Sequence, residues 1–597
     1  MKAQDLLLEI GLEEIPARFA QEASQQLAER VSAWLSDQQI AHGAVLSYVT
    51  PRRLAVLVKE VAAKQADQVE VARGPAKKVA VDANGQWTQA ALGFARSQQV
   101  DVQDLYFDRF KGTEYVFAKK EKKGEATLNL LPQIKTVIEQ MSFPKQMRWG
   151  STSFSFVRPI RWLVALYGGE VIPFEIAGVR TGNQSRGHRF KGGIVTLTEP
   201  ARYEEALKEQ FVLVDPNRRR QVILDGLKSL EKERHWHIPV DEELLEEVVH
   251  LVEYPTLVWG KYDTSFLELP TEVLITSMKE HQRYFPVKDE SGQLLPYFVT
   301  VANGIEDEDG LIAKGNEKVL KARLTDARFF YEEDQKLEIA TALSKLEKVV
   351  YHQKLGSLAD KMRRVRKLAL KLADQLGFGA DETAALGRAA QIYKFDLVTH
   401  MVYEFPELEG KMGEVYARLA GEKEEVAKAI FEHYLPRHSG DPLPQTPAGA
   451  VLAVADKLDA LAAFFGLGLI PTGSQDPYAL RRQAFGIVAI IVEQRWALSL
   501  GTLLDWSLAI LEEEGLLARN KEEVKEDLMV FIKQRLKYRL EQNGLRYDVI
   551  EAVLGSTKDD LAALEEIGHL LNEKMKGEEI KGQVESLTRV TNLARKL

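Results

Sequence analysis

Cysteine is absent from all 597 residues of the chain. Its absence excludes disulfides, thiolate zinc sites and cysteine nucleophiles, so any metal would have to be bound by histidine and carboxylate side chains. Long apolar runs are missing too, because no segment approaches the ~18 uncharged residues of a membrane span. The first residues also lack the apolar stretch and cleavage site of a secretory signal. We therefore expect a cytoplasmic protein that does not associate with membranes.

Common catalytic motifs are also missing. The chain has no GxxxxGK[ST] phosphate loop, no GxSxG elbow, no HExxH motif and no GxGxxG after a predicted strand. Together these absences argue against a self-contained enzyme that uses nucleotides. The net charge of −9 does not exclude a nucleic-acid partner, because such a partner requires a basic surface and not a basic total.

The composition, 45% hydrophobic and 28% charged, is that of a globular protein. A single core stops growing at roughly 250–300 residues, so several domains are expected. We predict a multidomain α+β fold with a mixed α/β N-terminal half and an all-α C-terminal half. The predicted domains are 1–195 (mixed α/β, with an insertion at about 65–125), 196–335 (mixed α/β), 336–500 (helical) and 501–597 (the start of a further helical domain).

Hydrophobic periodicity predicts the main elements. Buried strands are expected at 6–10, 212–214 and 297–302, and a helix from Phe19 to Leu35. The cations between Lys361 and Lys371 predict the solvated face of a helix whose apolar stripe starts at Met362. A last amphipathic helix from Ile580 to Leu593 has no stop signal. Either this helix packs back on the preceding part of the chain, or the chain ends inside a domain.

His352, Asp396 and Asp456 lie on separate predicted helical segments, with spacing that resembles HD phosphohydrolases. Asp456 stands in an apolar helix, where a lone carboxylate is costly unless it is bound or paired. However, Phe395 precedes Asp396 where that family has a metal-binding histidine, and a phenyl ring cannot bind a cation. We therefore predict that 336–500 is a degenerate HD-like helical domain without a metal. The alternative is that Asp456 only caps a neighbouring helix or pairs with a lysine such as Lys394.

Three clusters of cations and aromatics are candidates for RNA contact, since arginine fits phosphate and rings stack on unpaired bases. The alternative for the first two clusters is a loop near a core tryptophan, and for the third it is arginine stems that cover a core. The candidate residues are Lys145, Arg148, Arg158 and Arg161 in the first cluster, Arg186, His188 and Arg189 in the second, and Arg535, Tyr538 and Arg539 in the third.

Several long stretches, in the same order, make the chain resemble the β subunit of bacterial heterotetrameric glycyl-tRNA synthetases. These stretches are Leu6 to Pro16, Phe143 to Trp162, Arg186 to Phe190, Met278 to Pro286, Gly315 to Leu320, Met401 to Phe405, Ala455 to Asp459 and Asp476 to Arg482. The last stretch adds Arg481 and Arg482 to the tRNA-binding candidates. The resemblance covers the chain from residue 6 to beyond 480, which is far more specific than any single motif.

The resemblance implies an α2β2 ligase that joins glycine to tRNA(Gly). ATP and magnesium are then used on the α subunit, and no cofactor, metal or catalytic residue is expected in this chain. It also implies that 501–597 begins an anticodon-binding domain of which most is missing. Two alternatives remain open: an HD-type metal-dependent nuclease or phosphohydrolase that uses His352, Asp396 and Asp456, and a scaffold that binds protein only.

Overall fold

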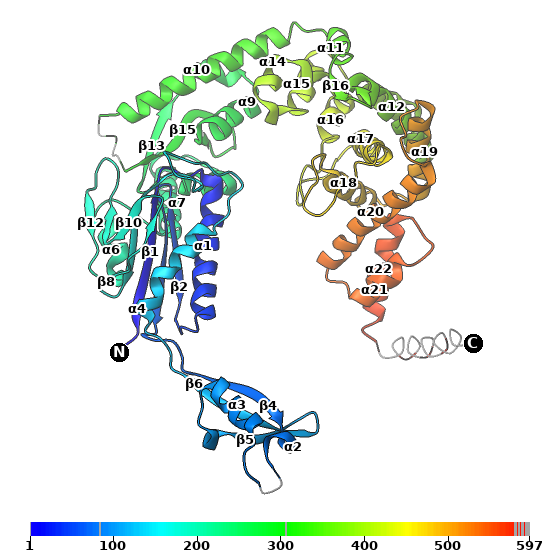
Figure 1. Ribbon diagram of the computed structural model, residues 1–597. Helices are drawn as coiled ribbons and strands as arrows, with labels where there is room; N and C mark the ends of the chain where they lie inside the picture. The colour runs from blue at the N-terminus through cyan, green and yellow to red at the C-terminus, as the bar shows by residue number, and fades with distance from the viewer. Residues whose placement is uncertain are drawn as a thin grey trace. The chain divides into compact units, whose positions relative to one another are not determined.

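The computed structural model describes residues 2–82, 85–304, 307 and 309–577, together with 582, 586 and 590. The chain divides into an N-terminal unit, 1–264 with 278–320, and a C-terminal unit, 265–277 with 321–597. The fold is multidomain and mixed α/β, as predicted (Figure 1). The four-domain division stays a prediction, and so does the helix expected from Ile580 to Leu593, which apart from 582, 586 and 590 lies outside the described residues.

The N-terminal unit is built on a seven-stranded sheet in the order β2-β3-β1-β7-β10-β9, with β8 beside β7 (Figure 1). Strand β1 lies between β3 and β7 and is antiparallel to both. The strand predicted at 6–10 is confirmed, but it continues through Gly11. The strands are β1 (Gln4–Leu12), β2 (Val45–Thr50), β3 (Arg53–Val61), β7 (Ile160–Tyr167), β8 (Glu170–Val171), β9 (Glu175–Ile176) and β10 (Val179–Gly182).

Both faces of this sheet are buried, which explains the nearly continuous apolar run of β1. Leu6, Leu8 and Ile10 pack in one core with helix α1 (Ala17–Asp37), which confirms the helix predicted from Phe19. Leu7 belongs to a second core on the other face. That face is covered by β11 (Gln184–Arg186), β12 (Ile194–Thr196) and α6 (Tyr203–Lys208).

Residues 68–122 form a three-stranded antiparallel sheet in the order β4-β6-β5 with two helices. Its small core is made of Ala80, Ala91, Ala95, Leu105, Val116 and Ala118. The strands are β4 (Gln68–Ala76), β5 (Tyr106–Phe110) and β6 (Thr113–Lys122), and the helices are α2 (Lys77–Ala80) and α3 (Gln89–Gln98). We call this part the insertion module.

The rest of the N-terminal unit contains a sheet in the order β13-β15-β14. The strand predicted at 297–302 is confirmed within β15, whereas the one at 212–214 is wrong. Val212 and Val214 are buried, but the segment is a loop in which the Leu213 N–H donates to the Glu253 carbonyl. The elements are α4 (Thr127–Leu130), α5 (Lys135–Glu139), α7 (Pro216–Arg234), α8 (Glu242–Val249), β13 (Pro255–Lys261), β14 (Phe285–Lys288) and β15 (Leu294–Asn303), followed by α10 (Leu311–Asp334), which runs into the C-terminal unit.

The C-terminal unit is helical apart from the short hairpin of β16 (Val350–His352) and β17 (Gly356–Ser357). Its central helix, α17 (Pro447–Gly466), is buried along nearly its whole length. The other helices are α9 (Thr271–Thr276), α11 (Ile339–Leu346), α12 (Leu358–Gln375), α13 (Ala380–Ile392), α14 (His400–Glu404), α15 (Lys411–Leu419), α16 (Glu424–Glu432), α18 (Leu480–Glu493), α19 (Leu500–Glu513), α20 (Lys521–Gln542), α21 (Tyr547–Leu554) and α22 (Leu561–Lys574).

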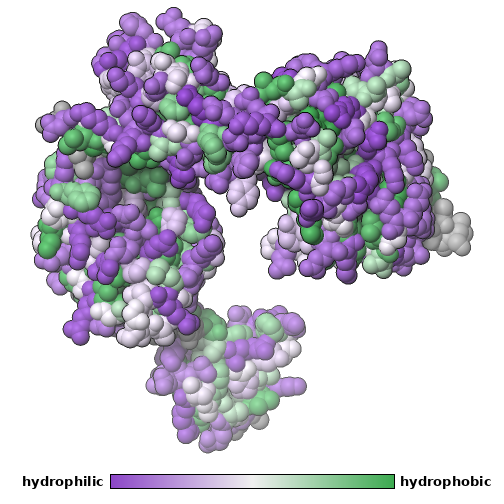
Figure 2. All heavy atoms as spheres, turned by 90° about the horizontal axis from the view of Figure 1, so that it is seen from above, coloured by the Kyte–Doolittle hydropathy of each residue, from purple (hydrophilic) through white to green (hydrophobic). Residues whose placement is uncertain are grey.

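The solvated face predicted for the cations of α12 is wrong at two positions. Lys361 and Arg364 are buried against α17, where Arg364 Nε lies 2.9 Å from Asp459 Oδ1. The apolar stripe that begins at Met362 is buried as predicted. Hydrophilic residues cover most of the surface in view in Figure 2. None of the described helices is long and apolar enough to cross a lipid bilayer.

Candidate nucleic-acid interface

A pocket of about 730 Å³ lies in the N-terminal unit, where the end of β1, the start of β7 and the β11–β12 hairpin meet. We call it the arginine pocket. Four arginines line it, and Glu13 is the carboxylate among its lining residues. The arginines are Arg52, Arg161, Arg186 and Arg189. Three of these four, Arg161, Arg186 and Arg189, were predicted candidates, and the structure brings the first and second clusters together here.

Three arginines lie close to the ring of Trp162. The guanidinium carbons of Arg52, Arg53 and Arg186 lie 5.7, 5.5 and 5.3 Å from its ring centroid. The ring occupies space beside Gly11, its partner across the strands, and a Cβ built there would come within 1.9 Å of the ring. Gly11 is therefore required so that the indole can lie against the sheet.

A buried polar network fixes the indole from below. Glu9, which is inaccessible to solvent, accepts hydrogen bonds from Trp162 Nε1, Ser185 Oγ and Tyr203 Oη. Arg53 also lies 3.6 Å from Glu9. Because a buried carboxylate is tolerated only when it is paired and hydrogen-bonded, these four groups are held in one arrangement.

Glu253 ties the two arginines of the β2–β3 turn together. Its carboxylate lies 3.0 Å from Arg53 and 3.4 Å from Arg52. Burial would raise the pKa of Glu253, but Arg53 and Thr50 outweigh burial and hold this pKa below its usual value. Burial lowers the pKa of Arg52, and Glu253 opposes that shift. Both arginines remain charged, and Arg52 presents its charge to the pocket.

The cations at the rim differ in how far they are neutralised. Arg161 and Arg189 form ion pairs with Glu13 at 2.5 and 3.5 Å, and Arg189 also reaches Glu14. Arg186 is exposed and has no carboxylate partner within the described part of the chain. Beside it, Phe190 and Ile194 are 75% and 69% exposed, which is unusual for large apolar side chains. The rim therefore offers a free cation next to rings and apolar surface.

The predicted histidine is not at the surface. His188 is 1% exposed, and its Nδ1 accepts hydrogen bonds from the backbone N–H groups of Phe190 and Lys191. Its ring packs on Gly304, where an added Cβ would lie 2.7 Å from Nε2. His188 therefore shapes the turn that carries Arg189 and Phe190.

The first cluster is only partly in the pocket. Lys145 and Arg148 are exposed on a loop that is anchored by the Met147–Phe156 bridge. Arg158 is instead occupied by backbone, since it donates to the carbonyls of Glu14 and Val157.

In the C-terminal unit, α18 and α20 pack together and bring two candidates close to each other. Burial and the neighbouring Arg481 both lower the pKa of Arg535, which lies 4.7 Å over the Phe531 ring. Arg482, the next residue of α18, is exposed, and Tyr538 of α20 is half exposed. Arg481, Arg482, Arg535 and Tyr538 are thus candidates on this helix pair.

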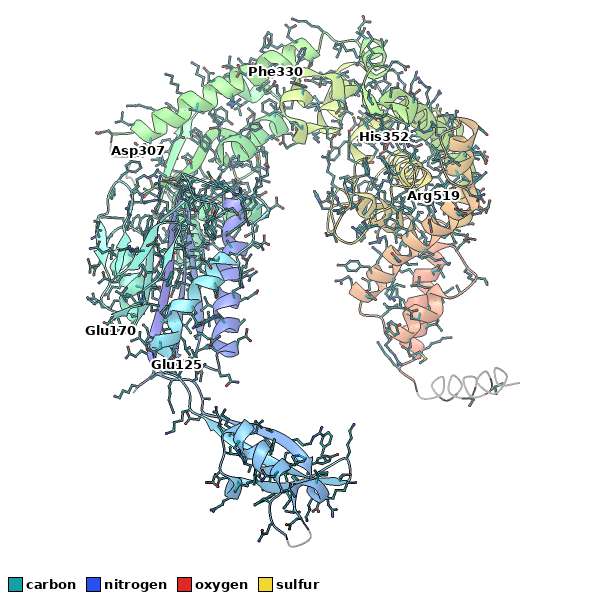
Figure 3. The ribbon with its side chains drawn as sticks, viewed as in Figure 1. Glu125, Glu170, Asp307, Phe330, His352 and Arg519 are labelled. Atoms are coloured by element: carbon teal, nitrogen blue, oxygen red, sulfur yellow. The ribbon has the colours of Figure 1, made fainter. Side chains whose placement is uncertain are left out.

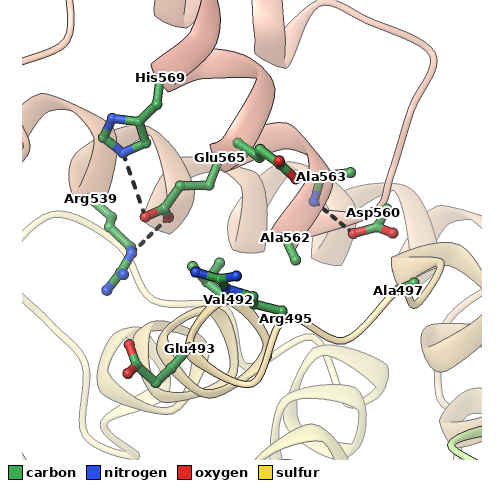
Figure 4. A pocket seen from close by; sticks show the side chains of 11 residues that line it. Val492, Glu493, Arg495, Ala497, Arg539, Asp560, Ala562, Ala563, Glu565 and His569 are labelled. Carbon is green, nitrogen blue, oxygen red and sulfur yellow. Dashed lines mark hydrogen bonds and ion pairs between the residues drawn. The ribbon is translucent and has the colours of Figure 1, made fainter.

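Arg539 faces a different environment. Its Nε donates to Glu565 at 2.7 Å, across a pocket of about 530 Å³ that Val492, Arg495 and His569 also line (Figure 4). Glu565 holds the guanidinium in a contact between α20 and α22. Arg539 therefore helps to join these two helices as well as adding positive charge to the surface.

The three HD-like positions have separate partners. His352 lies on strand β16 (Figure 3), so its predicted place on a helical segment is wrong. Its ring is 5.8 Å from that of Phe464. Asp396 Oδ2 accepts from the backbone N–H groups of Gly410 and Gly413, and burial raises the pKa of Asp396 to about 6.

Asp456 lies 3.2 Å from Lys361 Nζ and accepts a hydrogen bond from Tyr393. Burial would raise the pKa of Asp456, but Lys361 and Lys394 outweigh burial and hold the pKa far below its usual value. Asp456 therefore pairs chiefly with Lys361 rather than with Lys394. No group of three or more histidine or carboxylate side chains within the described residues could hold a metal ion.

Sequence reasoning missed Arg52 and Glu253. The available signal was Pro51-Arg52-Arg53, a pair of cations in a tight turn between two predicted strands. Glu253 gave no signal, because its role depends on a contact across 200 residues.

The family model described as glycyl-tRNA synthetase beta subunit matches residues 6–555. The glycine–tRNA ligase beta subunit of Halalkalibacterium halodurans is 53% identical over 596 residues, which are 100% of this chain and 86% of that protein. That of Bacillus subtilis is 51% identical over 596 residues with the same coverage, and that of Listeria welshimeri is 49% identical over 594 residues.

Matches of this extent define the class of protein as a subunit of an aminoacyl-tRNA ligase complex. The chain belongs to the glycyl-tRNA synthetase beta subunit family, which confirms the resemblance found in the sequence. The name beta subunit implies a partner alpha subunit.

Proposed function

We propose that this chain holds tRNA(Gly) so that its end reaches glycyl-adenylate on the alpha subunit, and that the arginine pocket is one of the surfaces that holds it. The observation that carries the proposal is the convergence of Arg52, Arg161 and Arg186 around a fixed indole. Guanidinium groups bind phosphate in a planar, bidentate way, and the exposed Phe190 ring offers a stacking surface for a base.

The chain's contribution to the reaction is positioning. Correct orientation of two reactants can lower a barrier by several kcal/mol without any chemical group from the positioning chain. We propose an α2β2 assembly in the cytoplasm, with ATP and magnesium used on the alpha subunit and no cofactor bound by this chain. The HD-like character of the C-terminal unit and an anticodon-binding role for α19 to α22 belong to the same proposal.

The test uses the complex of this chain with the alpha subunit. Arg186→Ala is expected to raise the KM for tRNA(Gly) about tenfold, and to leave glycine-dependent ATP–pyrophosphate exchange unchanged, because one phosphate contact is lost and the activation site is elsewhere. The matched control is Arg180→Ala, which removes an 86% exposed arginine from β10 of the same unit.

An equal KM in the two variants would refute the role of the pocket. Robust pyrophosphate exchange by the isolated chain would refute the division of labour between the subunits.

A further inference from the structure

Within the described part of the chain, no helix covers one face of the insertion module. Helices α2 and α3 pack on one side of the β4-β6-β5 sheet, over Val116 and Ala118. Directly paired residues of an antiparallel sheet share a face, so the strand register identifies the side chains of the opposite face. They are Val71 opposite Lys119, Arg73 and Tyr106 on either side of Phe117, and Asp108 opposite Tyr115, with Phe110 at the strand end.

Four aromatic rings lie on this outer face. Tyr106 stacks with Phe117 at a centroid distance of 5.9 Å, and Phe110 meets Tyr115 edge to face at 6.5 Å. Phe110 is 44% exposed, and Val69 and Val71 at the margin are also exposed. Aromatic side chains normally belong to a core, so four on an uncovered sheet indicate a surface that binds something.

Cations are interleaved with these rings. The Arg73 guanidinium lies 4.2 Å from the Phe110 centroid and 5.1 Å from that of Tyr115, and Lys119 Nζ lies 5.1 Å from that of Tyr106. Neither cation has a carboxylate within ion-pair distance among the described side chains. Asp108 is the acidic side chain described on this face, and it accepts the backbone N–H of Arg109.

Rings and unpaired cations on one face favour a nucleic-acid strand over an apolar protein surface as the bound partner. An apolar protein surface laid on the rings would bury Arg73 and Lys119 without partners, which is costly. A nucleic-acid strand satisfies both features, because its phosphates pair with the cations while its bases stack on the rings. A duplex does not present its base faces, so the strand must be unpaired.

We propose that the outer face of the insertion module binds unpaired RNA nucleotides, with bases stacked on Tyr106 and Phe110 and with phosphates at Arg73 and Lys119. The proposal extends tRNA binding to a second surface, which shares no residue with the arginine pocket. It assigns a direct role to a part of the chain that the sequence marked only as an insertion.

The test is a titration of the full chain with a fluorescent 12-nucleotide RNA that has no self-complementarity. Tyr106→Leu keeps the apolar area but removes the ring, and is expected to weaken binding about 5- to 100-fold. Phe110→Leu should act in the same direction. Arg73→Ala should weaken binding and reduce the slope of log affinity against log salt by about 0.7, the value for one phosphate on a single strand.

The matched control is Arg96→Ala, which removes the same charge from the exposed side of α3 on the covered face. It should leave the affinity for the 12-mer within twofold. A blunt-ended RNA duplex of the same length should compete poorly. All titrations are repeated in the Arg186→Ala background, so that a further loss caused by Tyr106→Leu is assigned to the module whether or not the arginine pocket binds tRNA.

Unchanged affinity for the 12-mer in Tyr106→Leu and Arg73→Ala would overturn the proposal. A loss of assembly with the alpha subunit in Arg73→Ala, with RNA affinity intact, would overturn it in favour of a protein-docking face. Circular dichroism of each variant, together with the agreement of the two leucine substitutions, separates loss of a contact from loss of the fold.

Discussion

Arg53 and Glu253 form an ion pair with an Nη2–Oε1 distance of 3.0 Å, and neither side chain is more than 1% exposed. The pair joins the start of β3 to the loop before β13, across 200 residues. The pair lies directly behind the arginine pocket. Two residues that line the pocket contact it, since Arg52 pairs with Glu253 and the Trp162 ring packs against Arg53.

Breaking this pair should be costly. Glu253→Gln is expected to destabilise the N-terminal unit by up to about 5 kcal/mol, because it removes the nearer of the two carboxylates that neutralise the buried Arg53 and leaves Glu9, at 3.6 Å, as the other. The measurement is hydrogen exchange of peptides from β3 and β13. Glu175→Gln, which breaks the exposed pair with Arg180, should change the same exchange by no more than about 0.5 kcal/mol. Equal effects of the two substitutions would contradict the assigned role of burial.

Gly11→Ala tests the packing of the indole. A methyl group at this position overlaps the Trp162 ring, so we expect a loss of about 1–3 kcal/mol and a weaker affinity for tRNA as the ring is displaced. Gly93→Ala is the matched control, because nothing lies within 4 Å of its added Cβ in helix α3. It should stabilise the insertion module by up to about 1 kcal/mol. Urea unfolding of both variants, followed by tryptophan fluorescence, distinguishes these opposite signs.

Two neighbouring residues of α20 should respond differently. Tyr538→Ala removes a half-exposed ring and is expected to weaken tRNA binding without changing the melting temperature. Arg539→Ala breaks the contact with Glu565 and should lower stability by about 1 kcal/mol, with tRNA affinity within twofold. Filter binding and differential scanning calorimetry on both variants provide the test, and the reverse pattern would show that Arg539 is the RNA contact.

Asp396 should leave a trace in the pH dependence of stability. Burial raises the pKa of Asp396 to about 6, above the roughly 3.9 of an unfolded aspartate. Between these values the folded state holds a proton that the unfolded state has released, so this group lowers the free energy of unfolding as the pH rises from about 4 to 6. Asp396→Asn lacks this contribution. The difference in unfolding free energy, variant minus native, should therefore increase by up to about 3 kcal/mol over that range in urea titrations. A difference that does not vary with pH would show that the carboxyl group titrates normally.

Hydrophobic periodicity predicted the strands and helices that rest on local patterns, such as β1, α1 and the apolar stripe of α12. It failed at 212–214, because an apolar run can be buried as a loop when neighbouring backbone supplies its hydrogen bonds. It also failed for Lys361 and Arg364, since the carboxylates that pair with them lie on α17, about 95 residues away. No local pattern carries that information.

The candidate site shows the same division. Arg161, Arg186 and Arg189 were identified from composition alone, because cations next to aromatics stand out in the sequence. The sequence could not show which of these arginines has no carboxylate partner. The partners Glu13 and Glu14 come from a part of the sequence 148 or more residues earlier. In the sequence, Arg158 and Arg539 were candidates of the same kind as Arg186. In the structure, Arg158 donates hydrogen bonds to backbone carbonyls and Arg539 donates to Glu565.

The position of β1 at the centre of its sheet imposes a delay during synthesis. Its hydrogen-bonding partner β7 follows it by about 153 residues, as the Glu9–Trp162 contact shows. At roughly 5–20 residues per second, the ribosome needs about 8–30 s to produce that partner. During this interval a strand with seven consecutive residues that are buried in the folded protein has one open edge, which is a template for aggregation. The nascent chain should therefore depend on chaperones most strongly before residue 167 has left the exit tunnel.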